Sequence, residues 1–224
     1  MPLQNQVVPR GLPVLPRNGQ GGQMNRIIVG MLLWSLGGSL FAQTAISDLR
    51  DEIDAGRVQL VSVAGNGSSS GTAITAYLLN ETATVKRVDV NLSRPLFLVN
   101  TGSSQNMIGI QVYLSDGAYS RDGRRSYITL RPRVRTGVLF VAFCVDFDKD
   151  NPSERDRFSI GTVPPVLAPV MANIRGYISE NPNVDVTVAA QAAVWLAQKK
   201  SIGEIRSRFP VTSSEERLAR QFIR

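Results

Sequence analysis

The chain has 224 residues, with 25 Lys+Arg, 18 Asp+Glu, one Cys, no His, 43% hydrophobic residues and a formal net charge of +7. This length suits one domain or two small ones. Without His, the chain lacks Ser-His-Asp and Cys-His nucleophile pairs and His-containing zinc sites. With a single Cys, it lacks an intramolecular disulfide framework and all-Cys metal clusters.

The first 42 residues show the pattern of an export signal. Residues 1–23 are rich in Pro and Gly and carry no periodicity, so we expect a disordered or overextended start. Residues 24–42 run from a short positive start through the apolar stretch 27–41 to Leu40-Phe41-Ala42, which is typical of a signal peptide. The alternative is retention of residues 27–41 as a membrane anchor, although a spanning helix needs about 20 apolar residues.

Export changes the charge and the expected partners. The removed residues carry three Arg and no acid, so the net charge falls from +7 to +4. We therefore expect an exported protein (periplasmic, cell-surface or extracellular) that binds no nucleic acid. It would contact a membrane only if the anchor were retained.

The middle of the chain is predicted to be β-structure. Residues 43–57 form a short helix or linker, with Ile46, Leu49 and Ile53 at helical spacing. Residues 58–150 contain seven short apolar or alternating runs with Gly, Asn, Ser and Asp between them, which favours an Ig-like antiparallel β-sandwich. The predicted strands cover residues 58–63, 72–79, 84–92, 96–99, 108–114, 126–130 and 138–145.

Residues 160–224 are predicted to form a small helical layer. Apolar residues between 166 and 178 recur on one wide helical face, and a second helix runs to about residue 199. Ser201 with Glu204, and Ser213 with Glu216, have the spacing of capping boxes that begin two further helices. The fold class is therefore α+β: an Ig-like sandwich followed by a C-terminal helical layer.

Cys144 is the residue with the most open interpretation. An odd Cys in an exported protein is unpaired, pairs between chains, or is reactive. Cys144 ends the apolar strand predicted from residue 138. The alternative interpretation is a small buried hydrophobic residue of that strand.

Two short motifs carry a resemblance. The block Phe143-Cys144-Val145-Asp146, followed downstream by Gln191-Ala192-Ala193-Val194-Trp195, resembles the paired signatures of bacterial surface thioester domains. The span also resembles a group of uncharacterised exported bacterial β-sandwich proteins that share Cys-x-Asp-x-x-Lys-x-x-Pro and then Gln-Ala-Ala-x-Trp. These positions are Cys144, Asp146, Lys149, Pro152 and Gln191 to Trp195.

The resemblance implies a specific chemistry. The thiol of Cys144 would attack the carboxamide of Gln191, release ammonia and leave an internal thioester that a surface amine could open. The side chains expected to shield the bond from water are Phe143, Phe147 and Trp195. The alternative is that Gln191 fills a polar gap and Trp195 anchors the core.

An acidic run and a basic run are weaker candidate sites. Asp146, Asp148 and Asp150 have the spacing of the first three ligands of a twelve-residue calcium loop. Such a loop needs Gly at its sixth position and Glu at its twelfth, and this chain has Asn151 and Arg157 there. A solvated acidic turn is the alternative, and no other cofactor is expected. The alternating residues Arg131, Arg133 and Arg135 predict one basic sheet face, and the alternative is an edge strand protected from self-pairing by charge.

The sequence predicts an exported, non-enzymatic envelope or surface interaction protein whose partner it does not specify. The alternative is a thioester-type domain that bonds covalently to surface amines through Cys144 and Gln191. No catalytic residue is assigned. A third class, an enzyme with a carboxylate site on Asp146, Asp148 and Glu154, is disfavoured because carboxylates so close together on a turn are usually solvated.

Overall fold

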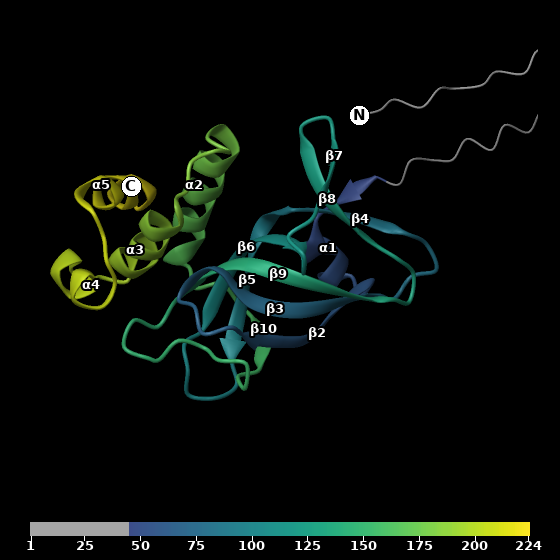
Figure 1. The fold of residues 1–224 in the computed structure, drawn as a ribbon, viewed down its shortest axis with the longest axis horizontal. Coiled ribbons are helices and arrows are strands. Elements are labelled where there is room, and N and C mark those ends of the chain that lie inside the picture. The colour runs from purple at the N-terminus through teal and green to yellow at the C-terminus, as the bar shows by residue number, and fades with distance from the viewer. Residues whose placement is uncertain (1–44) are drawn as a thin grey trace, which may run out of the picture. The chain divides into compact units, whose positions relative to one another are not determined.

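The computed structural model of the protein describes residues 45–224 (Figure 1). The expected disordered start (1–23) and signal peptide (24–42) lie outside the described residues. The described part contains two β-sheets, one of them nearly barrel-like, and helices, which confirms an α+β composition.

The larger sheet has six antiparallel strands that nearly close on themselves. Their order across the sheet is β10-β5-β6-β9-β3-β2. The two edge strands of this sheet, β2 and β10, approach each other. At the end of β2, Gly65 and Gly67 donate backbone hydrogen bonds to the carbonyl oxygens of Ser153 (3.2 Å) and Pro152 (2.8 Å), which lie just before β10. The strands are β2 (Val58–Gly65), β3 (Ser70–Asn80), β5 (Asn91–Asn100), β6 (Met107–Leu114), β9 (Arg135–Cys144) and β10 (Phe158–Gly161).

The smaller sheet has four strands and is joined to the larger one at Val90. The Val90 N–H donates to Ser126 at 2.9 Å, and its carbonyl oxygen accepts from Val112 in β6 at 2.8 Å. Helix α1 (Leu49–Asp54) packs beside β5 and β2. In the order β1-β4-β8-β7, the strands are β1 (Ile46–Ser47), β4 (Lys86–Asp89), β8 (Arg125–Leu130) and β7 (Ser120–Asp122).

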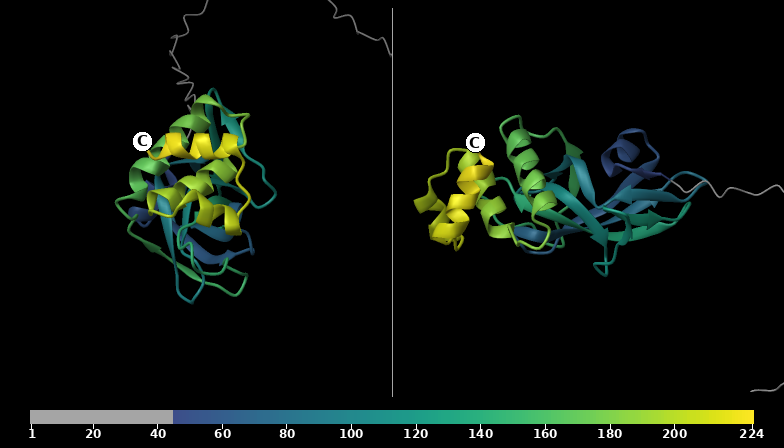
Figure 2. Two further views of the ribbon diagram at one scale, coloured as in Figure 1. Left: turned by 90° about the vertical axis from the view of Figure 1, so that its left-hand side faces the viewer. Right: turned by 90° about the horizontal axis from the view of Figure 1, so that it is seen from above.

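Four helices form a layer against one end of the β-structure (Figure 2). Helix α3 packs on β9 and β3, and its row of alanines allows a close approach to the sheet. Within the described residues, no helix has the length and apolar character needed to cross a membrane. The helices are α2 (Leu167–Glu180), α3 (Thr187–Ala197), α4 (Ile202–Arg208) and α5 (Ser213–Phe222).

The capping residues of the last two helices confirm one prediction and correct another. Ser201 and Glu204 form the predicted capping box of α4. The box of α5 is made by Thr212 and Glu215, one residue earlier than the predicted Ser213 and Glu216. Both pairs have the required spacing, and Thr212 is the residue that has the extended backbone of an N-cap.

The predicted basic sheet face is wrong. Residues 131–134 form the connection between β8 and β9, and Arg135 alone of the three arginines belongs to a strand. Pro132 has no N–H to donate to a strand pair, and Arg133 has a positive φ of 58°. Arg133 forms an ion pair with Glu81. The three side chains therefore do not alternate along one strand.

Candidate functional site

Cys144 lies at the end of β9, in the centre of the larger sheet. Strands β6 and β3 flank β9, so the residue is enclosed from both sides in the sheet. The side chain is fully buried, and its sulfur lies 3.3 Å from the Met107 sulfur and 3.8 Å from Oδ1 of Asn151. This buried position is compatible both with a structural strand residue and with a thioester partner.

Gln191 of α3 places its carboxamide directly on the backbone of Cys144, 47 residues away in the sequence. Its Oε1 accepts the Cys144 N–H at 2.9 Å, a hydrogen that is shared with the Ser69 carbonyl oxygen at 2.9 Å. Its Nε2 donates to the Cys144 carbonyl oxygen at 2.8 Å. The structure thus brings together the two residues that the resemblance pairs.

Gln198 adds a second contact of the same kind. Its Nε2 donates to the carbonyl oxygen of Val145 at 2.9 Å, next to the peptide group that Gln191 holds. Glutamines seven residues apart lie on one helical stripe, so α3 pairs with the end of β9 through two side-chain amides. The sequence places both on one stripe but does not indicate that they bind consecutive backbone carbonyls.

Buried aromatic side chains lie on the segments that carry this junction. Phe143, Phe147 and Trp195, the predicted shielding residues, are each no more than 9% exposed. The rings of Phe147 and Trp195 meet edge to face at 5.1 Å, and Trp195 meets Phe209 in the same way at 5.6 Å. Phe147, Trp195 and Phe209 therefore form one packed aromatic cluster around Trp195, four residues after Gln191 in α3, and their shielding of the Cys144–Gln191 contact stays a prediction.

A small pocket of about 180 Å³ lies beside the junction and is lined in part by Gln105, Trp195 and Asn151. Within residues 45–224, neither Oε1 of Gln105 nor Nε1 of Trp195 has a hydrogen-bond partner, although both atoms are buried. A buried polar atom without a partner is costly. Asn151 lines the pocket and also contacts the Cys144 sulfur, so a ligand in the pocket would be one side chain away from that sulfur.

The surroundings of Cys144 keep its thiol protonated. Burial raises its pKa from 9.0 to about 12, and the negative charge of Asp146 adds to the shift. The neutral thiol is a poor nucleophile, because the thiolate is the reactive form.

The acidic run after β9 is held by neighbouring protein groups. Asp146 accepts from the Asn106 N–H at 2.8 Å and pairs with Lys149, and Asp148 pairs with Lys200 at 2.8 Å. Across the described range 45–224, no three His, Cys, Asp or Glu side chains gather as a metal site. The carboxylates of Asp146, Asp148 and Asp150 are therefore not brought together around one point.

No family model, curated protein or solved structure matches the chain. The function is therefore inferred from the site alone.

Proposed function

We propose that the protein is a non-enzymatic interaction module that attaches covalently to a primary amine through an internal thioester between Cys144 and Gln191. The observation that carries the proposal is the pair of hydrogen bonds that holds the Gln191 carboxamide on the backbone of Cys144, the residue whose sulfur would attack it. Both residues are fully buried, which a thioester requires in order to survive in water.

The bond-forming step balances without an oxidant or a metal. The Cys144 sulfur attacks the Gln191 carboxamide carbon, the C–N bond breaks, and the thiol proton leaves with the nitrogen as ammonia. An incoming amine then attacks the same carbon, forms an amide and returns the proton to Cys144 as a free thiol. Each chain reacts once, which makes this an attachment and not a turnover.

The Cys144 backbone assists the first step. Negative charge develops on Oε1 of Gln191 as the sulfur attacks, and this oxygen already accepts the Cys144 N–H. The departing nitrogen is held by the Cys144 carbonyl oxygen. The raised pKa of the thiol opposes the step, so we expect the bond to form slowly.

Intact mass spectrometry tests the proposal. The thioester-containing chain is lighter than its calculated mass by one ammonia, and methylamine replaces the lost ammonia and frees one thiol. Cys144→Ala and Gln191→Ala abolish the deficit. Gln198→Ala is the matched control, because it removes a half-buried glutamine from the same helical stripe, one that also binds a backbone carbonyl, and it leaves the deficit in place.

An interaction module without a covalent bond is the second candidate. The observation in its favour is that both polar atoms of the Gln191 carboxamide are already hydrogen-bonded to backbone groups, as a purely structural glutamine requires. A wild-type mass without deficit, together with a thiol that methylamine leaves unchanged, would reject the thioester and leave this candidate.

Export remains part of the proposal. It is supported by the sequence of residues 24–42, and it predicts that the mature protein begins near Gln43. N-terminal sequencing of the protein from its own cells checks this. A full-length product beginning at Met1 in the cytosol would contradict it.

The Ig-like sandwich also remains a prediction. In its favour are two mainly antiparallel sheets joined through Val90. The approach of Gly65 and Gly67 to the segment before β10 favours a nearly closed barrel instead. The two folds differ in how β2 and β10 are placed. In a sandwich they would lie in two sheets packed face to face, whereas in a barrel they would lie side by side and close a single sheet. A crystal structure distinguishes these two arrangements.

A further inference from the structure

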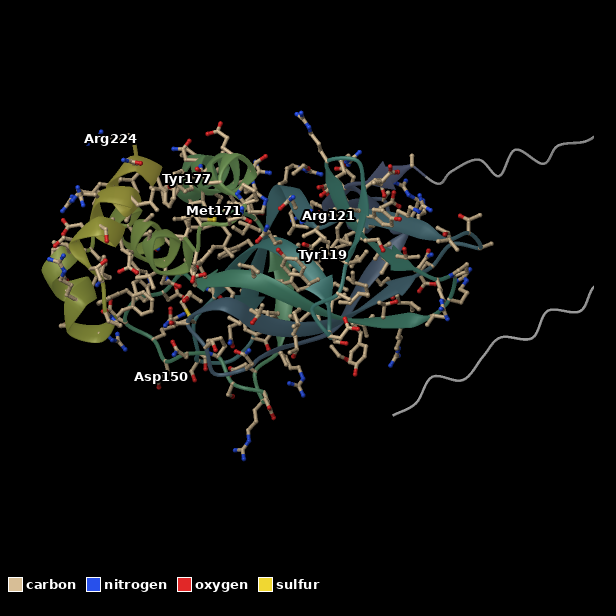
Figure 3. All side chains as sticks on the ribbon, turned by 45° about the horizontal axis from the view of Figure 1, so that its top comes forward. Tyr119, Arg121, Asp150, Met171, Tyr177 and Arg224 are labelled. Atoms are coloured by element: carbon tan, nitrogen blue, oxygen red, sulfur yellow. The ribbon has the colours of Figure 1, made fainter. Side chains whose placement is uncertain are left out.

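A larger pocket lies away from Cys144, where the hairpin of β7 and β8 faces the end of α2. Its volume is about 550 Å³, within the range of roughly 300–1,000 Å³ that small-molecule sites occupy. Figure 3 shows Tyr119 and Arg121 on this hairpin, well separated from Asp150 near the Cys144 junction. No residue lines both this pocket and the one beside Cys144.

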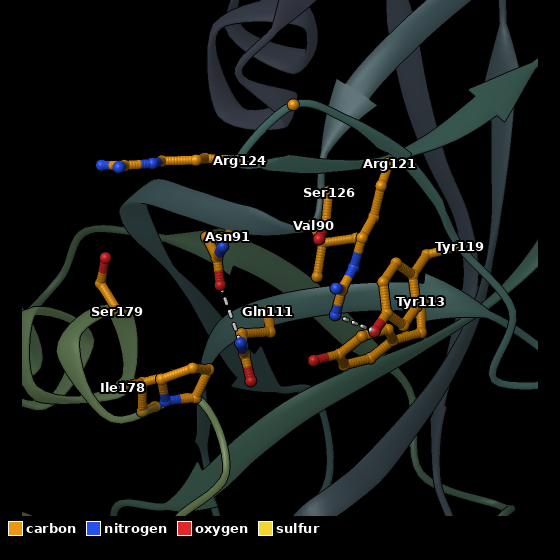
Figure 4. Close-up of a pocket in the computed structure, with 12 residues that line it drawn as sticks. Val90, Asn91, Gln111, Tyr113, Tyr119, Arg121, Arg124, Ser126, Ile178 and Ser179 are labelled. Atoms are coloured by element: carbon orange, nitrogen blue, oxygen red, sulfur yellow. Dashed lines mark hydrogen bonds between the residues drawn. The ribbon is translucent and has the colours of Figure 1, made fainter.

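Two tyrosines form one wall of the larger pocket. The rings of Tyr113 and Tyr119 lie 5.7 Å apart and are inclined by 59° (Figure 4). Inclined rings do not make the parallel platforms between which a flat base stacks. They do offer apolar faces to a puckered ring that has C–H groups on its faces and hydroxyls at its edge.

Two arginines give the pocket a positive charge. Arg121 donates to the Tyr119 hydroxyl at 3.1 Å and lies over the Tyr119 ring at 5.6 Å, which orients its guanidinium. Arg124 lies on the same hairpin, and no Asp or Glu lines the pocket. In the part of the chain that the structure describes, neither arginine forms an ion pair. An anion would therefore meet two unpaired guanidinium groups.

Two amide side chains supply a donor and an acceptor. Nε2 of Gln111 donates to Oδ1 of Asn91 at 2.8 Å, which fixes the orientation of both groups (Figure 4). This bond leaves Oε1 of Gln111 and Nδ2 of Asn91 for a ligand. A neighbouring acceptor and donor suit the hydroxyls of a sugar.

We infer that this pocket binds an acidic sugar, a hexuronic acid unit of a polysaccharide. The carboxylate meets Arg121 and Arg124, the ring lies against Tyr113 and Tyr119, and the hydroxyls reach the amide pair. The inference is independent of the thioester, and a pocket for envelope or matrix polysaccharide gives an interaction module a second, reversible mode of attachment.

Titration calorimetry on the Cys144→Ala chain tests the inference, because this chain cannot form a thioester. The probes are a trimer of galacturonic acid and its methyl ester, which has the same rings without the negative charge. Arg121→Gln and Arg124→Gln should each weaken binding of the acid by roughly tenfold, as expected for the loss of a charge-assisted hydrogen bond. Tyr119→Leu should weaken the binding of both the acid and the ester, because both have the same sugar rings.

Arg155→Gln is the matched control, because Arg155 is an exposed arginine that does not line the pocket. It should leave binding unchanged, and the ester should bind the parent chain about as weakly as the acid binds Arg121→Gln. Absence of saturable binding, or an equal loss in Arg155→Gln, would overturn the inference. Tighter binding of inorganic phosphate or of a single-stranded oligonucleotide than of the acid would also overturn it, in favour of a phosphate ligand.

Discussion

At the scale of single residues, the carboxamide of Gln191 takes the place of a backbone peptide group. It offers one acceptor and one donor to Cys144, as a neighbouring strand residue would. Because Gln191 is fully buried, both atoms need these partners whether or not a bond to sulfur forms. The same contact therefore serves stability and, in our proposal, chemistry.

The Cys144 thiol should react slowly in the folded protein. Labelling is measured on protein that has been treated with methylamine. This treatment leaves a free Cys144 thiol in every chain, whether or not a thioester had formed before. A pKa of about 12 in place of 9.0 lowers the thiolate fraction at pH 8 about a thousandfold. Labelling by a disulfide reagent should therefore be far slower in buffer than in denaturing urea, because burial lowers the thiolate fraction and also limits access to the sulfur.

The same shift gives a pH dependence of stability. The unfolded chain loses the thiol proton near pH 9.0, whereas the folded chain keeps it until about pH 12. The free energy of unfolding should therefore decrease as the pH rises from 9 to 12, and Cys144 contributes its full amount below pH 9. Urea unfolding of the methylamine-treated protein, which carries the free thiol, should show this component, and Cys144→Ala should lack it. Equal slopes for the two proteins, or equal labelling rates with and without urea, would contradict the raised pKa.

At the scale of elements, the helical layer is connected by edge-to-face aromatic contacts. Phe222 of α5 meets Tyr177 of α2 at 5.5 Å, and Phe209 after α4 meets Trp195 of α3. Asn173 of α2 also donates to the Phe222 carbonyl oxygen at 2.9 Å. The position of α5 therefore depends on its tertiary contacts and on where its first turn begins.

Thr212→Ala should destabilise the protein by about 1 kcal/mol, the typical cost of losing an N-cap side chain. Thr212 Oγ1 accepts from the Glu215 N–H, and Glu215 accepts from the Thr212 N–H at 2.7 Å. Ser213→Ala is the matched control and should change the free energy of unfolding little, since α5 is capped one residue earlier. Thermal or urea unfolding measures both variants, and a larger cost for Ser213→Ala would restore the register predicted from sequence.

Elements with a regular pattern could be predicted, and short ones could not. β2, β3, β6, β8 and β9 lie where alternating or apolar runs predicted strands. The strands β1, β7 and β10 have two to four residues and were missed, because such lengths are too short to show a period and depend on pairing with a distant strand. The basic face predicted for residues 131–135 was wrong because the alternation of arginines was read across Pro132, which interrupts a strand.

At the scale of the whole described molecule, the near-closure of the larger sheet depends on a close approach at Gly65. A Cβ at this position would lie 2.4 Å from the carbonyl oxygen of Pro152, a backbone atom that cannot rotate away. Gly65 therefore lets β2 approach the segment that leads into β10, and that segment also carries Asn151, which contacts the Cys144 sulfur.

Gly65→Ala should lower the free energy of unfolding by about 1–3 kcal/mol, because it overpacks this contact. Gly176→Ala is the control: no atom lies within 4 Å of its Cβ, and alanine favours the interior of α2 by about 0.5–1 kcal/mol. Urea unfolding should move the two variants in opposite directions. A Gly65→Ala protein as stable as the parent would show that the sheet ends do not meet as described.

The candidate sites differ in how far the sequence indicated them. The resemblance paired Cys144 with Gln191, and the structure places them in contact. The unpartnered atoms of Gln105 and Trp195 could not be foreseen, because they depend on what fails to reach them in the folded chain. The larger pocket combines β5, β6, the β7–β8 hairpin and α2, and no local pattern reports such proximity.

The hydrogen bond from Nε2 of Gln191 has a mechanical consequence if the thioester forms. That nitrogen leaves as ammonia, so a hydrogen bond between α3 and β9 is exchanged for a covalent cross-link across 47 residues. A pulling force applied through the C-terminal end would then reach the sheet through a carbon–sulfur bond, and the chain between Cys144 and Gln191 would bear no tension. Capture of an amine would cut this cross-link and make the intervening segment extensible under force, so that an attached molecule would lengthen where an unattached one stays short.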